Sequence, residues 1–367
     1  MELRKNKISE YETAKPHTIS KFNLIEAYVK KWAQILLNIP SCKKIIFIDC
    51  MSNDGLYKND CGETIYGTPI RVSKYLCDIM KNYTDKNCLL IFNDLSKKKI
   101  TTLLNHLPAC TSNFIIQTYS EDANALLKRI YHSSKGDHTL LVYDPYEASI
   151  DWSALSPYFK SWSELIINHM HSDTVRAISQ VKQKDAVNKY EQTYLMKLND
   201  LISFGTDKDK YEERIKDIIQ LHRGASSNNY YVASFPFFNS TNNIVYNLIH
   251  CSNHIKGFEL FKNVAWKTFG GKSSKKKTYG NENQFSFNFN DGLPIVIDTD
   301  DSCYQVYDIA SYIYNNFKNK GKVTFTDVWG CLMTHPVFPS EGYRDEVKKI
   351  LRDHFNVIIK KSTFDFS

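Results

Sequence analysis

The sequence lacks paired-cysteine motifs, long apolar segments and any block of one charge beyond a single short run. Its 9 cysteines are an odd number, form no C-x-x-C pair and have no histidine ligand set beside them. This excludes a disulfide-stapled scaffold and a structural zinc site, and it indicates free thiols in a reducing compartment. No segment reaches the roughly 20 apolar residues of a transmembrane helix, and the polar amino terminus has no signal-peptide core. We therefore expect a cytoplasmic protein with neither a metal site nor a membrane segment.

The composition is that of an ordinary globular protein. Of the 367 residues, 42% are hydrophobic and 24% are charged, which excludes a disordered or fibrous chain. This length holds about two domains, because single cores stop growing near ~250 residues. The formal net charge of +7 is spread along the chain, and its one dense run extends from Lys272 to Lys277. Such a balance permits an anionic partner and weakly favours nucleic acid.

Short apolar runs alternate with helical patterns over most of the chain. Ser20 is the expected N-cap of a first helix, on which Lys21, Lys30 and Lys31 are predicted to form a solvated face. Buried strands are predicted at 45–48, 88–92, 114–116, 139–143 and 164–168. Strands that alternate with helices at this rhythm indicate βαβ units and a parallel sheet.

These patterns predict an α/β protein with a Rossmann-like domain at residues 20–270, preceded by an arm at 1–19. Its sheet is expected to be mostly parallel, with helices on both faces. A charged helical insertion is expected at about 180–225. The apolar runs 230–232 and 244–250, joined by a polar turn, suit antiparallel edge strands.

The last hundred residues differ from this rhythm. Gly, Ser and Lys dominate the start of residues 271–300, which predicts an exposed basic loop or linker. Three helical patterns and a terminal strand follow within 301–367. That order is typical of a small winged-helix-like domain.

A candidate site follows the first strand. Asp49 ends its apolar run and leads into the turn-rich cluster from Ser52 to Gly55. Because open α/β sheets bind ligands at the carboxyl ends of their strands, this loop is the first place to expect a ligand.

Several different short motifs occur along the chain. They are the helix from Lys21 to Trp32, Phe47-Ile48-Asp49 through Gly55, Gly67-Thr68-Pro69, Tyr143-Asp144-Pro145-Tyr146, Glu164 to Asn168 with Arg176, and Gly257 to Lys262 with Trp266. In this order they resemble the three-Cys-motif partner (TcmP) family, whose members carry a class I methyltransferase-like Rossmann core. The resemblance covers almost the whole chain and implies a protein partner with a three-cysteine motif.

The resemblance also implies S-adenosylmethionine as the cofactor. The residues that would frame its methionine end are Asp49, Met51, Asn53 and Gly55, and those that would meet its ribose are Asn93 and Asp94. The family loop Asp-Leu-Phe-Ala-Gly-Pro-Gly is here Asp-Cys-Met-Ser-Asn-Asp-Gly, so one glycine is replaced by Asn53. Asn adopts positive φ more readily than other residues with a side chain, so the turn can persist.

Asp144-Pro145-Tyr146, at the end of the fourth predicted strand, is the candidate catalytic motif. In amino-methyltransferases such a motif grips an exocyclic amine through oxygen acceptors while the aromatic ring stacks on the base. The alternative is an acid that caps a turn, followed by a core tyrosine. A second polar cluster follows the fifth strand and comprises Asn168, His169, His171, Asp173 and Arg176.

The basic run supplies the candidate nucleic-acid contacts. Lys272, Lys275, Lys276 and Lys277 could neutralise phosphates, although charge runs are more often solvated loops. Two hypotheses stay open. The chain is a TcmP-type methyltransferase-like protein that acts on or is recruited to DNA or RNA, or it is a binding subunit that keeps the Rossmann scaffold without turnover.

Overall fold

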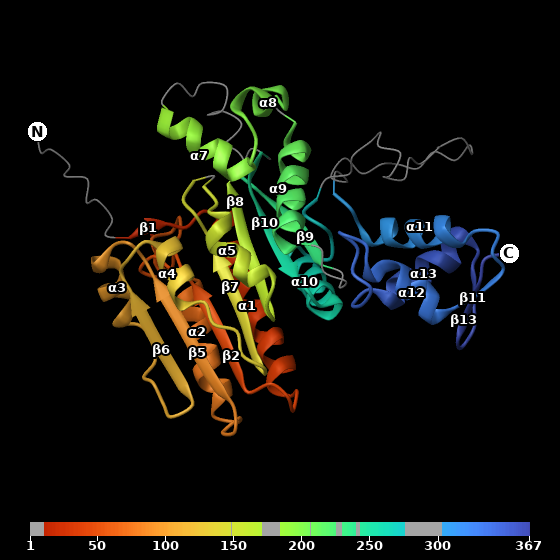
Figure 1. Ribbon diagram of the computed structural model, residues 1–367. Coiled ribbons are helices and arrows are strands. Elements are labelled where there is room, and N and C mark those ends of the chain that lie inside the picture. Colours follow the sequence, from red (N-terminus) through yellow and green to blue (C-terminus); the bar gives the residue numbers. More distant parts are fainter. Residues whose placement is uncertain are drawn as a thin grey trace, which may run out of the picture. The chain divides into compact units, whose positions relative to one another are not determined.

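The computed structural model describes residues 11–147, 149–170, 184–205, 207–224, 230–239, 243–275 and 303–367. Contacts divide the chain into two compact units (Figure 1). The first unit consists of Met1–Tyr230 and Phe237–Asn253, and the second of Tyr231–Pro236 and His254–Ser367.

A seven-stranded sheet has the order β6-β5-β2-β7-β8-β10-β9. Its strands are β2 (Lys44–Asp49), β5 (Asn87–Asn93), β6 (Phe114–Tyr119), β7 (Asp137–Tyr143), β8 (Ser163–Met170), β9 (Tyr231–Phe238) and β10 (Ile244–Ser252). The pairs from β6 to β8 are all parallel, whereas β10 is antiparallel to β8. Numbered along the chain, the strand order is therefore 3-2-1-4-5-7-6. The predicted α/β class with a mostly parallel sheet is confirmed.

The five predicted parallel strands all form. Their apolar runs reflect burial, as the prediction assumed. In β2 every residue from Ile45 to Asp49 is buried, as expected for a central strand covered on both faces. The run at 244–250 forms the antiparallel strand β10, but β9 lies outside it, so β10 is not the edge strand.

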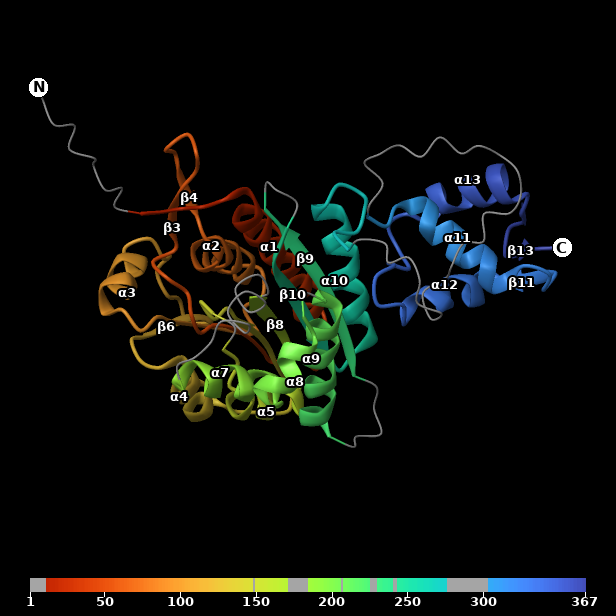
Figure 2. The same ribbon diagram turned by 90° about the horizontal axis from the view of Figure 1, so that it is seen from above.

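Helices cover both faces of the sheet. Figure 2 shows α1 and α2 on one face and α4, α5 and α9 on the other. The helices of the first unit are α1 (Pro16–Leu37), α2 (Thr68–Met80), α3 (Lys97–Leu104), α4 (Ala123–Ile130), α5 (Trp152–Phe159), α7 (Lys184–Tyr194), α8 (Leu198–Ser203) and α9 (Lys208–Arg223). The expected N-cap at Ser20 is wrong. The helix begins at Pro16, whose fixed φ suits a first helical position.

A small second sheet, which the sequence did not predict, lies in the first unit. It has the order β1-β3-β4, formed by Glu12–Thr13, Leu56–Lys58 and Thr64–Tyr66. β1 pairs in parallel with β3, with Glu12 opposite Tyr57. The end of the predicted amino-terminal arm is thus tied to the chain just after the Asp49 loop.

The second unit combines α10 with the carboxyl-terminal elements. These are α10 (Ile255–Thr268), α11 (Val306–Phe317), β11 (Lys322–Thr324), α12 (Phe325–Met333), α13 (Arg344–Phe355), β12 (Ile358–Ile359) and β13 (Thr363–Asp365). The three strands form an antiparallel sheet of order β11-β13-β12. Three helices after residue 303 agree with the sequence pattern, while two of the three strands were not predicted. The winged-helix assignment itself stays a prediction.

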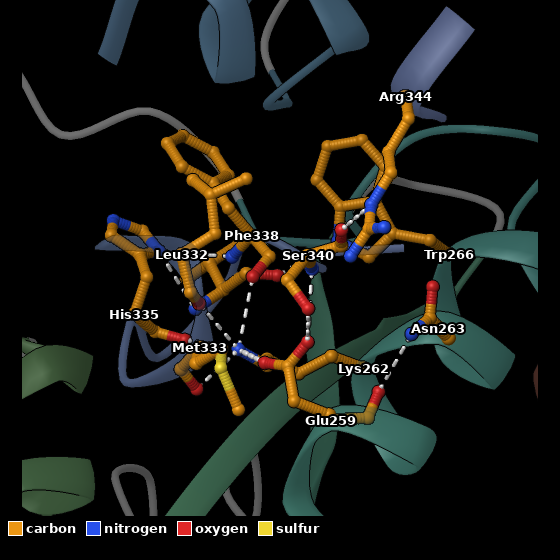
Figure 3. A network of polar contacts seen from close by, with 11 residues as sticks. Glu259, Lys262, Asn263, Trp266, Leu332, Met333, His335, Phe338, Ser340 and Arg344 are labelled. Atoms are coloured by element: carbon orange, nitrogen blue, oxygen red, sulfur yellow. Dashed lines mark hydrogen bonds and ion pairs between the residues drawn. The ribbon is translucent and has the colours of Figure 1, made fainter. Parts of the chain in front are cut away.

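A buried lysine joins α10 to the loop that links α12 and α13 (Figure 3). Lys262 is fully buried and forms an ion pair with Glu259 one helical turn earlier. Its ammonium group donates to the carbonyls of Leu332 (3.0 Å), Met333 (3.1 Å), His335 (2.8 Å) and Phe338 (3.0 Å). Nearby, the indole N–H of Trp266 donates to the carbonyl of Val337 at 2.9 Å. The predicted boundary at residue 270 falls after α10, whereas these bonds group α10 with the carboxyl-terminal helices.

Candidate functional site

The strand order reverses between β2 and β7, and this switch point is where open α/β sheets bind ligands. Asp49, the last residue of β2, is opposite Val142 of β7, two residues before Asp144. Two carboxylates therefore meet at the carboxyl edge of the sheet, as the position of both residues at strand ends predicted.

Asp49 is almost completely buried, with 4% of its surface exposed. Burial raises the pKa of its carboxyl group to about 7, and the negative charges of Asp144 and, less strongly, Asp94 act in the same direction. The backbone N–H of Met51 and the ammonium group of Lys21 oppose this rise. The switch point is thus an acidic locus in which an added positive charge would be stabilised.

The loop after Asp49 has a left-handed turn, although Asn53 stands where the resembled family loop has a glycine. Asn53 has φ of 58° and Gly55 has φ of 71°. Asn53 fits because its side-chain oxygen accepts the N–H of Asp54 at 2.8 Å. A Cβ atom at Gly55 would lie 3.0 Å from the Ile70 side chain. Both the positive φ and this close contact therefore favour glycine at this position. Met51 is half-buried, and its N–H donates to Asp49 at 3.4 Å.

The two residues predicted to meet a ribose have different roles. Asn93 is buried, and its amide N–H groups donate to the carbonyls of Cys50 and Glu121, both at 3.0 Å. Its amide oxygen accepts the N–H of Glu121 at 3.2 Å, so the Asn93 side chain braces the loops. Asp94 is half-buried, and one of its oxygens accepts the N–H of Ser96 at 2.8 Å. Asp94 is the better placed of the two to bind hydroxyl groups.

Both carboxylate oxygens of Asp144 have protein partners. Lys21 of α1 donates to one oxygen at 2.5 Å, and the amide of Asn168 donates to the other at 2.5 Å. The prediction that Lys21 belongs to a solvated face is wrong, because its side chain is only 11% exposed. Lys30, by contrast, forms a surface ion pair with Glu26 at 2.6 Å. Helical periodicity alone could not reveal that one lysine faces the edge of the sheet.

The alternative interpretation of this motif required Tyr146 to be a core residue. The structure shows that it is not. Its side chain is 75% exposed, and its hydroxyl donates to Glu12 at 2.9 Å. The same carboxylate accepts the amide N–H of Asn53 at 3.3 Å and lies 3.6 Å from the Lys99 ammonium group. Glu12 therefore bridges three elements at this edge, and sequence analysis missed it because it precedes the first recognisable helix.

The remaining predicted residues are on β8, in the second unit or outside the described residues. Lys272 and Lys275 are half-buried in the second unit, beside the buried residues Ser273 and Ser274. His169 is buried on β8 and contacts the Tyr194 hydroxyl at 2.8 Å. Outside the described residues lie Lys276, Lys277, His171, Asp173, Arg176 and nearly all of the predicted linker.

The described ranges hold no group of three or more His, Cys, Asp or Glu side chains arranged to bind a metal ion. None of the helices described there has the length and apolar character needed to cross a membrane.

No protein-family model matches the sequence, and no curated protein matches it either. Among solved structures, the Legionella pneumophila protein LPL1258 of family DUF519 shares 9% identity at a TM-score of 0.38, over 65% of this chain and 86% of that one. The O-methyltransferase TomG of Streptomyces achromogenes, solved with SAM, has 9% identity and a TM-score of 0.33, over 62% and 78%. Human methyltransferase-like protein 13, solved with SAH, has 10% identity and a TM-score of 0.31, over 72% and 96%. Identities and TM-scores this low give no information about activity. The fold class therefore rests on the strand order of the sheet itself.

The chain has a Rossmann-like core with a mostly parallel sheet. The strand order 3-2-1-4-5-7-6, in which β10 is antiparallel to β8, supports this assignment, and activity has to be argued from the site itself.

Proposed function

We propose that this chain binds S-adenosylmethionine at the switch point and is a methyltransferase-like protein. The observation that carries the proposal is the convergence of Asp49, Asp94 and the left-handed turn at Asn53 and Gly55 on one edge of the sheet. An acidic locus suits this cofactor, which carries a sulfonium and an ammonium charge.

The residues present fit the cofactor in chemistry. Asp49 would face the methionine ammonium group, whose charge would stabilise the ionised form of this buried carboxyl. Asp94 would accept hydrogen bonds from the ribose hydroxyls with the oxygen that Ser96 does not use. The backbone from Asn53 to Gly55 would lie against the methionine end. The bound cofactor would supply an electrophilic methyl group.

The substrate side of the proposal depends on the Asp144-Pro145-Tyr146 motif. The exposed ring of Tyr146 is available to stack on a base, an interaction typically worth ~1–3 kcal/mol. We propose DNA or RNA as the substrate or recruiting polymer, and a partner with a three-cysteine motif, as the TcmP resemblance implies. A cytoplasmic location is part of the same proposal.

A second function is favoured by three specific contacts. Both oxygens of Asp144 are already bonded, and the Asn53 amide is held by Glu12. A chain whose site groups are satisfied internally could serve as a binding subunit that keeps the scaffold without turnover.

Calorimetric titration with S-adenosylmethionine distinguishes the two functions. The proposal expects saturable heat for the wild type and at least tenfold weaker binding for Asp94→Ala, because a lost charged hydrogen bond costs about 1.5–3 kcal/mol. Asp78→Ala, an exposed aspartate on α2, is the matched control and should bind normally. No heat and no thermal shift at millimolar ligand would leave the binding-subunit function.

A further inference from the structure

Asp144 was predicted to accept hydrogen bonds from an exocyclic amine, but in the structure both of its carboxylate oxygens already have partners. Its two oxygens accept from Lys21 and Asn168, each at 2.5 Å. Each oxygen keeps a second lone pair, but an incoming amine would have to compete with these two short charge-assisted bonds for the carboxylate. The acceptor for a substrate is therefore better sought among the partners of Asp144.

Asn168 offers such an acceptor. It follows Ile167, the β8 residue opposite Tyr143 of β7, and only 3% of its surface is exposed. Because an ionised carboxylate only accepts hydrogen bonds, the Asn168 amide must present its N–H₂ group to Asp144. Its oxygen Oδ1 is buried and has no hydrogen-bond partner among the described residues. A buried carbonyl left in this state is costly unless a ligand satisfies it.

Lys21 offers the complementary donor. Its ammonium group has three N–H donors. Among the described residues it has Asp144 as its hydrogen-bond acceptor, and it lies 5.1 Å from the centre of the Tyr246 ring. Lys21 is 9% exposed, so solvent has little access to its other donors. Lys21 and Asn168 each bond one oxygen of the same carboxylate, so Asp144 holds a residue with spare donors and a residue with a spare acceptor.

We propose that Lys21 and Asn168 form a recognition pair for an amino-substituted heterocycle, with Asn168 accepting from the exocyclic amine and Lys21 donating to the adjacent ring nitrogen. A cytosine-type edge, with an N–H₂ group beside a ring acceptor, has this pattern, whereas a uracil-type edge has it reversed. Asp144 is then the positioning residue that holds both groups. The substrate class deepens the proposed function and rests on it for methyl transfer, but the binding preference does not require the cofactor.

The test compares cytidine with uridine by saturation-transfer NMR and calorimetry. These probes avoid the adenosyl group, which would bind at the cofactor locus. We expect the wild type to prefer cytidine at least tenfold, since an unpaired buried polar group costs about 1–3 kcal/mol. Asn168→Leu should abolish the preference. Asn247→Leu, which alters another buried asparagine of the same sheet, bonded to Glu212, should keep it.

Wild-type protein that binds the two nucleosides equally, or binds neither, overturns the inference even if Asn168→Leu fails to fold. Lys21→Arg, which retains a charge for Asp144, is expected to fold and to lose most of the cytidine affinity through altered donor geometry. A cytidine preference without S-adenosylmethionine binding would support the pair while removing the proposed methyl transfer.

Discussion

Asp49 is the residue whose environment departs most from that of a surface carboxylate. Burial and neighbouring negative charge raise its pKa from 3.8 to about 7. The folded state therefore holds a proton on Asp49 under conditions in which the unfolded chain has released it. The resulting contribution to stability is complete below pH 4 and is lost as the pH rises from about 4 to 7.

Asp49→Asn should therefore stabilise the protein at pH 8 and leave its stability nearly unchanged at pH 4. The shift corresponds to an upper bound of roughly 4 kcal/mol at pH 8. Urea unfolding at both pH values measures the difference, with Asp78→Asn as an exposed control. An equal effect of Asp49→Asn at the two pH values would show that its carboxyl titrates normally.

At the same scale, sequence analysis placed Asp49, Asp94 and Asp144 correctly at strand ends, because a strand end follows directly from where an apolar run stops. It could not show which side chains are already satisfied. The loop-bracing bonds of Asn93, the ion pair of buried Lys21 and the bridge made by Glu12 join residues that are 28 to 134 positions apart in the sequence. Such pairings depend on the folded sheet and not on local pattern.

At the scale of elements, the six-residue motif from Gly257 to Lys262 contributes a structural clamp. Lys262 is fully buried, and burial lowers its pKa to about 8 although Glu259 opposes this. Glu259 in turn accepts the N–H of Ser340 at 2.9 Å and also its hydroxyl. The α12–α13 loop therefore has its carbonyls and one N–H tied to α10.

Lys262→Met should destabilise the second unit by about 3–5 kcal/mol, since it leaves a buried carboxylate and several carbonyls without their cation. Thermal unfolding by calorimetry measures this loss. Lys256→Met removes an exposed lysine from the same helix and should change stability by no more than about 0.5 kcal/mol. Equal stabilities of the two variants would mean that the clamp contributes nothing.

The elements themselves were largely predictable. Five parallel strands were visible as apolar runs because each is buried on both faces. The short strands β1, β3, β4, β11 and β13 were missed, since two or three residues carry no periodicity that distinguishes them from turns.

At the scale of the whole molecule, the net charge of +7 permits an anionic partner without naming one. If the basic run binds nucleic acid, changing Lys275, Lys276 and Lys277 to Glu should weaken binding to any sequence. It should also flatten the plot of log affinity against log salt concentration by about 0.9 for each lost duplex phosphate contact. Mobility-shift titrations at several salt concentrations measure both effects.

The charge-matched control changes Lys81, Lys97 and Lys98, all exposed in the first unit, to Glu. Equal loss of affinity in both triple variants would point to overall charge. An unaltered mobility shift in the first variant would remove the basic run from the interface.

The proposed S-adenosylmethionine site lies where β2 and β5 end. Ultraviolet crosslinking of methyl-labelled S-adenosylmethionine to the wild type, followed by peptide mapping, tests it most directly. We expect label in peptides containing residues 49–55 or 94–96. This label should be competed by S-adenosylhomocysteine and strongly reduced in Asp94→Ala. Label confined to other peptides, or none above the level seen with denatured protein, would contradict it.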